Sequence, residues 1–140
     1  MKDVLIPTDF STASKNALES ALPILKNGKE PIHVLLLNTF LVPFAPPAES
    51  VALHDQLKQY SLDSLEKTRA ELEAKTPPGE ISFEALSYMG SLENVVAFLV
   101  QERKIDCVVL GTDRKSRSDE VIKIMGRVSC PILIVPFHPA

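Results

Sequence analysis

Short apolar runs alternate with longer stretches of helical periodicity along this chain. Most of the apolar runs lack a strict alternation of polar and apolar residues, which is typical of strands covered on both faces. We predict strands at "DVLIP", "IHVLLLNTF", "ISFEALSYM", "DCVVLG" and "PILIVP". Only "ISFEALSYM" alternates, so we expect one of its faces to be more exposed, as at the edge of a sheet.

Four stretches between these runs have helical spacing. "STASKNALESALPILKNG" has Ser11 or Thr12 as a candidate N-cap and Gly28 as a stop, and Pro23 is expected to kink it or to require a local adjustment. "LVPFAPPAES" carries three prolines and is predicted to be a loop. The long helix that follows is predicted from Val51 to about Lys75. Its apolar face is formed by Leu53, Leu57, Tyr60, Leu65 and Leu72.

Two shorter helices complete the pattern. "LENVVAFLVQERK" follows Ser91 as N-cap and turns Val95, Val96 and Leu99 toward the core, and "SDEVIKIMGRVS" precedes the last strand. A strict alternation of buried strands and helices predicts an α/β fold, an open doubly wound five-stranded parallel sheet with helices on both faces. We expect one domain over residues 1–140, with a ligand crevice at the carboxyl ends of the strands.

Composition and charge argue against some classes of binding partner. The formal net charge is -3 and the pI is near 5.6, whereas nucleic acids and anionic membranes require a basic face. No apolar stretch approaches the roughly 20 residues that span a bilayer, and the N-terminal apolar run is too short for a signal peptide. We therefore expect a cytoplasmic protein that binds neither nucleic acid nor membrane. Cys107 and Cys130 lack a CxxC spacing and are interpreted as buried, reduced thiols.

No catalytic or metal-binding motif emerges from the sequence. His33, His54 and His138 are scattered without the spacing of metal ligands, and we interpret His33 as a strand-edge residue. The Gly-x-Ser-x-Gly elbow, the Walker lysine loop and the dinucleotide glycine motif are all missing. We expect a protein that is not an enzyme and holds no metal.

Four stretches together resemble the universal stress protein family. They are "VLIPTDFSTASKNAL", "HVLLLNTF", "GSLENVVAFLVQERKIDCVVLGT" and "CPILIVP", which in order and spacing cover essentially the whole chain. "PTDFS" is the most specific of these fragments. The resemblance implies an adenine nucleotide alpha hydrolase-like fold with strand order 3-2-1-4-5.

The resemblance also implies an adenine-nucleotide crevice. Pro7, Thr8 and Asp9 match the end of the first strand, which borders adenine and ribose in the family, and Thr39 matches the second-strand position whose backbone meets the base. For Asp9 a structural role, capping the helix that follows, has equal weight with nucleotide contact. At the fourth strand the candidate residues are Leu110, Gly111, Asp113 and Arg114.

The phosphate-binding loop departs from the family pattern. Members that bind ATP carry Gly-x-x-Gly, nine residues, then Gly-Ser or Gly-Thr. Gly111 matches the first glycine and would suit a tight turn where a ligand approaches the backbone, but Arg114 and Ile124 replace the next two glycines. Gly126 is followed by Arg127 only a few residues before the last strand. We interpret this as a degenerate loop shortened by a deletion.

Charges around this loop agree with the interpretation. Asp119 and Glu120 fall in the first turn of the predicted helix, where they stabilise its dipole and occupy the place of a triphosphate. A cationic trio, Arg114, Lys115 and Arg117, is interpreted as a solvated loop whose bases pair with neighbouring acids.

Three functional hypotheses follow. The favoured one is a non-enzymatic regulatory or binding protein of the stress response, without a dedicated cofactor and with weak or lost binding of ATP, while adenosine or AMP suffers less. The alternative is a protein that binds ATP or AMP and hydrolyses ATP slowly with a loop rebuilt around the cationic trio. The third is a partner-binding domain whose crevice is filled by its own side chains.

The last strand predicts self-association. "ILIV" is apolar on both faces and lies at the edge of the expected sheet without a lysine or an internal proline. Members of the family commonly dimerise through that edge. We therefore predict a symmetric homodimer that pairs antiparallel across Ile132–Val135.

Overall fold

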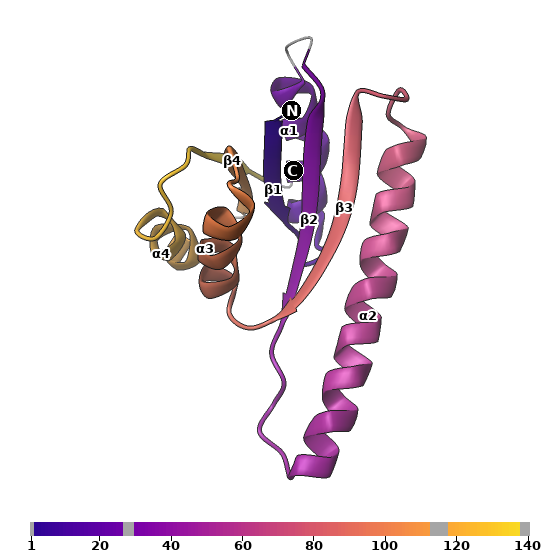
Figure 1. Cartoon of the computed structure of the whole chain (residues 1–140), viewed down its shortest axis with the longest axis vertical. Coiled ribbons are helices and arrows are strands. Elements are labelled where there is room, and N and C mark those ends of the chain that lie inside the picture. The colour runs from indigo at the N-terminus through magenta and orange to yellow at the C-terminus, as the bar shows by residue number, and fades with distance from the viewer. Residues whose placement is uncertain (1, 27–29, 113–117, 138–140) are drawn as a thin grey trace.

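The computed structural model describes residues 2–26, 30–112 and 118–137 (Figure 1). Strands and helices alternate along the chain as the hydrophobic pattern predicts. In chain order the elements are β1 Lys2–Pro7, α1 Thr12–Leu25, β2 Ile32–Phe40, α2 Pro47–Ala74, β3 Ile81–Met89, α3 Leu92–Arg103, β4 Cys107–Thr112, α4 Ser118–Met125 and β5 Ile132–Pro136.

The five strands form one parallel sheet in the order β3-β2-β1-β4-β5. This confirms the predicted doubly wound fold and its strand order. The chain winds outward through β2 and β3 on one side of β1 and through β4 and β5 on the other. The carboxyl ends of β1 and β4 therefore flank the topological switch point, where such sheets bind ligands.

Helices cover both faces of the sheet, and two hydrophobic cores result (Figure 1). Val4 and Ile6 of β1 pack in the core under α1 and α2, whereas Leu5 between them packs under α3 and α4. All three side chains are fully buried. Because successive side chains of a strand point to opposite faces, a run of consecutive apolar residues is what a doubly covered strand requires.

The first helix begins as predicted. Ser11 is the N-cap of α1, and its side chain accepts a hydrogen bond from the backbone N–H of Ser14. Pro23 lies inside the last turn, and the helix ends when the N–H of Lys26 donates to the carbonyl oxygen of Leu22 at 2.9 Å. The predicted stop at Gly28 lies outside the described residues.

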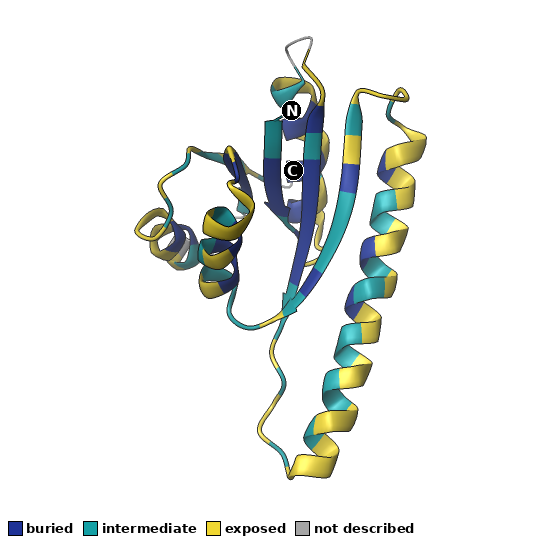
Figure 2. Ribbon diagram, in the orientation of Figure 1, coloured by how far each residue is buried: buried dark blue, intermediate teal, exposed yellow. Residues whose placement is uncertain are grey.

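The long helix α2 differs from the prediction at both its start and its apolar face. It begins at Pro47, four residues before Val51, because proline fits the first turn of a helix, where its missing N–H would have no helical partner. Its buried residues are Ser61, Leu65 and Leu72, all in the second half, whereas Tyr60 is 65% exposed. The first half extends beyond the sheet and stays largely exposed (Figure 2).

A polar cluster joins β2, β3 and α3 near the amino ends of the two strands, at the edge of the sheet opposite their carboxyl ends. Arg103 donates two hydrogen bonds to the carboxylate of Glu84, at 2.7 and 3.0 Å. His33 bridges this carboxylate and the hydroxyl of Ser82, at 2.9 and 2.6 Å. His33 is in register with Asp3 of β1 on one side and Ser82 of β3 on the other, so it lies near the start of an interior strand and not at an edge of the sheet. The bidentate arginine, followed by the histidine, lowers the pKa of Glu84 to about 2.

Within the described ranges, none of the helices has both the length and the apolar character needed to traverse a membrane.

Candidate functional site

The end of β1 is fixed by hydrogen bonds through Thr8. Its backbone N–H donates to the carbonyl oxygen of Leu37 at 2.7 Å, and its buried hydroxyl hydrogen-bonds the hydroxyl of Ser14 at 3.0 Å. The same hydroxyl oxygen accepts the N–H of Phe10 at 3.0 Å. The strand end and the start of α1 are therefore held together before any ligand binds.

Asp9 supports the start of α1. Its Oδ1 accepts hydrogen bonds from the backbone N–H of Ser11 at 2.9 Å and from the hydroxyl of Ser14 at 3.0 Å. These contacts give Asp9 the structural role that the sequence left open. The residue also borders the crevice described next, so contact with a ligand is compatible with this role.

A crevice of about 240 Å³ opens at the carboxyl ends of β1 and β2. It brings together four residues predicted from the sequence: Pro7, Thr8, Asp9 and Thr39. Its other walls come from the end of β2, the start of α3 and α4; they are Leu37, Asn38, Phe40, Leu41, Gly90, Ser91, Leu92 and Glu120. Sequence reasoning missed the α3 side. The topology could have predicted this wall, because the turn after β3 must lie at the same edge of a parallel sheet as the turns after β1 and β2.

Buried polar side chains form the floor beside this crevice. The side-chain amide of Asn38 donates to the carbonyl oxygen of Thr8 at 2.8 Å, and its Oδ1 accepts the hydroxyl of Ser61 at 2.7 Å. The hydroxyl of Ser87 donates to Ser61 at 2.6 Å, and Lys58 donates to the carbonyl oxygen of Ser87. Each described buried side-chain donor or acceptor has a partner. The network therefore locks β1, β2, β3 and α2 in one arrangement.

Gly111 lies within β4 and not in a turn, which corrects the expectation for this residue. A Cβ at position 111 would lie 2.9 Å from the carbonyl oxygen of Ala13 and 2.9 Å from the Cβ of Ala17. Contacts of that length are essentially never seen for a Cβ, so this glycine lets α1 pack directly on β4. Close packing of a helix on a strand, and not the approach of a ligand, accounts for the missing side chain.

The space beside the end of β4 is nearly filled. Leu110 and Gly111 border a cavity of only about 20 Å³, which α4 closes with Glu120, Val121 and Ile124. Ile124 is 1% exposed and belongs to the core under α3 and α4. The position where the family pattern asks for a glycine is therefore a core position here. Asp113 and Arg114, with Lys115 and Arg117, lie outside the described residues.

The first turn of α4 places acidic side chains at this edge of the sheet. Asp119 and Glu120 both fall in that turn, as the sequence predicted. Glu120 borders the crevice as well as the small cavity at β4.

The two thiols show no sign of reactivity. Cys107 is buried and Cys130 half-buried, and neither forms a disulfide. Burial raises the pKa of both thiols, which keeps them protonated at neutral pH. Among the residues that the structure describes, no group of histidine, cysteine and acidic side chains is arranged to hold a metal ion.

Comparison with known proteins identifies the family. The family model described as the universal stress protein family matches residues 1–136. The chain belongs to this family. A search of curated protein sequences finds no significant relative.

Solved structures of the universal stress protein family show the same fold. A protein of this family from Burkholderia pseudomallei is 14% identical with a TM-score of 0.76, covering 97% of this chain and 96% of its own. The universal stress protein UspA from Lactobacillus plantarum is 18% identical with a TM-score of 0.73, covering 96% and 97%. A member from Arabidopsis thaliana, described with AMP bound, is 18% identical with a TM-score of 0.72, covering 99% and 93%.

Proposed function

We propose that this universal stress protein is a non-enzymatic regulatory protein of the stress response whose crevice accepts adenosine or AMP and binds ATP weakly or not at all. The size of the crevice supports this proposal. Sites for drug-sized ligands usually enclose roughly 300–1,000 Å³. A crevice of about 240 Å³ suits a nucleoside or its monophosphate better than a triphosphate. The Arabidopsis relative, described with AMP bound, has the same fold.

The groups around the crevice suit a purine nucleoside. Pro7 and Leu92 offer apolar surface for a base, and the backbone at Asn38 and Thr39 offers polar groups for its edge. The N-terminus of α3, capped by Ser91, also borders the crevice. The positive end of that helix dipole favours one phosphate group nearby.

The first turn of α4 carries the proposal against ATP. A triphosphate that extends from the crevice toward β4 meets the carboxylate of Glu120 and a space of only about 20 Å³. Val121 and Ile124 fill that space as core residues, so it does not open without loss of packing. Adenosine and AMP avoid the obstruction because they end before it.

The absence of enzymatic activity remains part of the proposal. Neither of the described histidines borders the crevice. His33 contacts Ser82 and Glu84 on β3. The ring of His54 lies beside that of Phe40, with the two ring centroids 5.6 Å apart. Release of phosphate from ATP by the purified protein, lost on mutation of the crevice, would instead favour the alternative of a slow ATPase.

We also propose that the protein acts as a homodimer through β5. This strand is at the edge of the sheet, so its outer backbone groups have no strand partner in the part of the chain that the structure describes. Ile134 on this strand is 42% exposed. A second copy paired antiparallel across Ile132–Val135 satisfies the backbone groups and covers Ile134 in one symmetric contact.

Calorimetric titration with AMP tests the crevice. Side chains at alternate positions of a strand point to the same face, so Thr39 shares the α3 side of the sheet with Leu35 and Leu37. A phenylalanine at position 39 should therefore fill the crevice. We expect AMP to bind the unmodified protein and to lose at least tenfold in affinity with Thr39→Phe. Ser20→Phe, on the exposed surface of α1, is the control and should bind as the unmodified protein does. Equal affinity in all three proteins would contradict the assignment of the crevice.

A further inference from the structure

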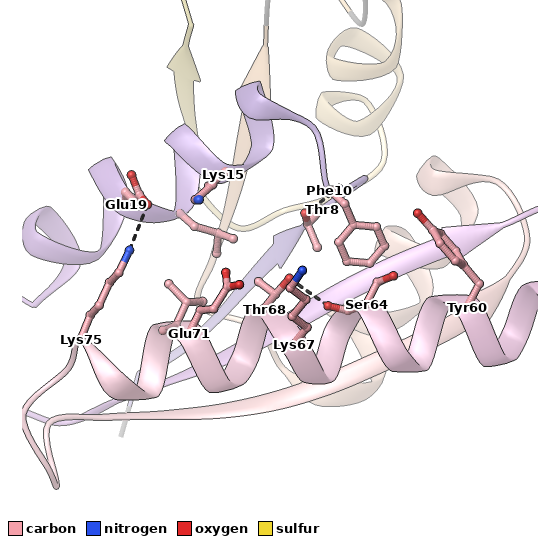
Figure 3. Close-up of a pocket in the computed structure, with 12 residues that line it drawn as sticks. Thr8, Phe10, Lys15, Glu19, Tyr60, Ser64, Lys67, Thr68, Glu71 and Lys75 are labelled. Atoms are coloured by element: carbon pink, nitrogen blue, oxygen red, sulfur yellow. Dashed lines mark hydrogen bonds and ion pairs between the residues drawn. The ribbon is translucent and has the colours of Figure 1, made fainter.

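A second groove lies between α1 and α2, on the face of the sheet opposite α3 and α4 (Figure 3). Its volume is about 350 Å³, larger than the crevice at the strand ends. Leu18 of α1 and Leu72 of α2 form an apolar floor and are 1% and 8% exposed. Because these two side chains are already almost buried, the apolar surface that a ligand removes from water comes mainly from other lining residues, above all Tyr60, which is 65% exposed.

One end of the groove is walled by two aromatic rings. Phe10 and Tyr60 meet edge to face, with ring centroids 6.3 Å apart and an interplanar angle of 89°. Phe10 has a φ of 65°, in the left-handed region that costs a non-glycine residue energy, and the hydrogen bond of its N–H to Thr8 helps to hold it there. Tyr60 is 65% exposed although it belongs to this pair. The strained backbone keeps an aromatic surface beside the groove.

Charged side chains line the rest of the groove and leave one positive charge in excess. Lys75 pairs with Glu19 at 3.6 Å at one end. Lys15 and Lys67 project from α1 and α2 toward the same space as Glu71, and among the described residues neither lysine makes an ion pair (Figure 3). Three lysines thus face two glutamates. This balance favours a ligand with one negative charge and penalises a doubly charged phosphate beside Glu71.

We propose that this groove is a binding site for a small aromatic carboxylate. The ring of the ligand packs against the aromatic pair of Phe10 and Tyr60, where flat apolar groups pack well. Its carboxylate accepts charge-assisted hydrogen bonds from Lys15 and Lys67. The site is separate from the crevice of the proposed function, because it is on the other face of the sheet and shares only Thr8 with it.

Calorimetric titration of the protein with 2-naphthoate tests this site. Neutral 2-naphthylmethanol is the matched ligand without the charge. We expect 2-naphthoate to bind severalfold more tightly than the alcohol, and Lys15→Gln or Lys67→Gln to weaken its binding by about two- to fivefold each, the effect of losing one exposed charge partner. Lys123→Gln removes an exposed lysine from α4 on the other face and should leave binding unchanged.

The aromatic wall has its own matched pair of variants. Tyr60→Ala should weaken the binding of 2-naphthoate by several-fold. Phe98→Ala is the matched control: it removes an exposed ring of α3 that is paired with Tyr88 of β3, and it should have no effect. The Thr39→Phe variant, whose crevice is filled, should bind 2-naphthoate as the unmodified protein does. Loss of binding in Thr39→Phe would place the probe in the crevice and overturn the proposal. Absence of binding at millimolar concentration, or unchanged binding in both lysine variants, would also overturn it.

Discussion

Replacing Gly111 with alanine separates two roles for this residue. If the glycine serves only to admit a ligand to the backbone, the added methyl group leaves the stability of the empty protein unchanged. The structure assigns it a packing role, because a Cβ would lie 2.9 Å from both the carbonyl oxygen of Ala13 and the Cβ of Ala17. One of these two contacts is with helix backbone, which cannot rotate away as a long side chain does.

The magnitude follows from the displacement that the methyl group requires. Ordinary contacts of a Cβ lie at 3.4–4 Å, so α1 must shift by at least 0.5 Å relative to β4. Such overpacking in a close-packed core typically costs about 1–3 kcal/mol. With a urea m-value of roughly 2 kcal/mol/M for a domain of this size, the unfolding midpoint should fall by about 0.5–1.5 M.

Urea unfolding followed by circular dichroism measures this shift in the ligand-free protein. Gly126→Ala is the control, because its Cβ would meet only the backbone oxygens of Lys123 and Ile122 at ordinary distances of 3.7 and 3.8 Å. We expect Gly126→Ala to change the free energy of unfolding by less than about 0.5 kcal/mol. The packing role is refuted if Gly111→Ala unfolds at the same urea concentration as the unmodified protein or as this control.

Three further perturbations have expected outcomes. Asn38→Ala should cost about 2–3 kcal/mol in urea unfolding, because it leaves the carbonyl oxygen of Thr8 and the hydroxyl of Ser61 without their buried partner. Ile134→Asp should convert the proposed dimer to a monomer in analytical ultracentrifugation at tens of micromolar. Glu84 has a pKa of about 2 when folded and 4.5 ordinarily, so its ion pair should stabilise the fold above about pH 4.5 and lose that contribution as the pH falls toward 2.

Each of these outcomes has a contrary result. A stability of Asn38→Ala within 0.5 kcal/mol of the unmodified protein would show that water replaces the amide at no cost. Ile122 is an exposed residue of α4, so Ile122→Asp is the control for Ile134→Asp and should not change the molar mass of the dimer. If both variants dissociate equally, β5 has no specific role in dimerisation. For Glu84, whose side chain is 35% exposed, solvent screening limits the contribution to about 1 kcal/mol. Glu84→Gln should lack that pH-dependent part, and an unfolding free energy with the same pH profile would contradict the pairing.

The sequence predicts the strands and the order of the elements because consecutive apolar residues in Val4–Ile6 or Val34–Leu37 have few alternatives to a doubly covered strand. It places the start of α2 too late because the three prolines before it suggest a loop, although Pro47 fits the first turn of a helix. Boundaries of this kind depend on the position of a proline within the turn, which composition alone does not reveal.

The sequence predicts the part of the candidate site whose residues are neighbours along the chain, and misses the part that depends on distant contacts. Pro7, Thr8 and Asp9 are adjacent in sequence and stay adjacent in the crevice. The floor network was not predicted, because Asn38 finds its partners 30 positions earlier in the chain and 23 positions later. The packing of Gly111 against α1 is equally invisible, since a glycine after a strand suggests a turn until the helix that covers it is placed.

The central claim is that the crevice has room for a nucleoside monophosphate and that α4 closes the path of a triphosphate. Calorimetric titration of the same protein preparation with AMP and with ATP and magnesium compares the two affinities directly. We predict that ATP with magnesium binds no more tightly than AMP, because the additional phosphates meet Glu120 and filled space. Binding of ATP with magnesium at least tenfold more tightly than AMP would contradict the account.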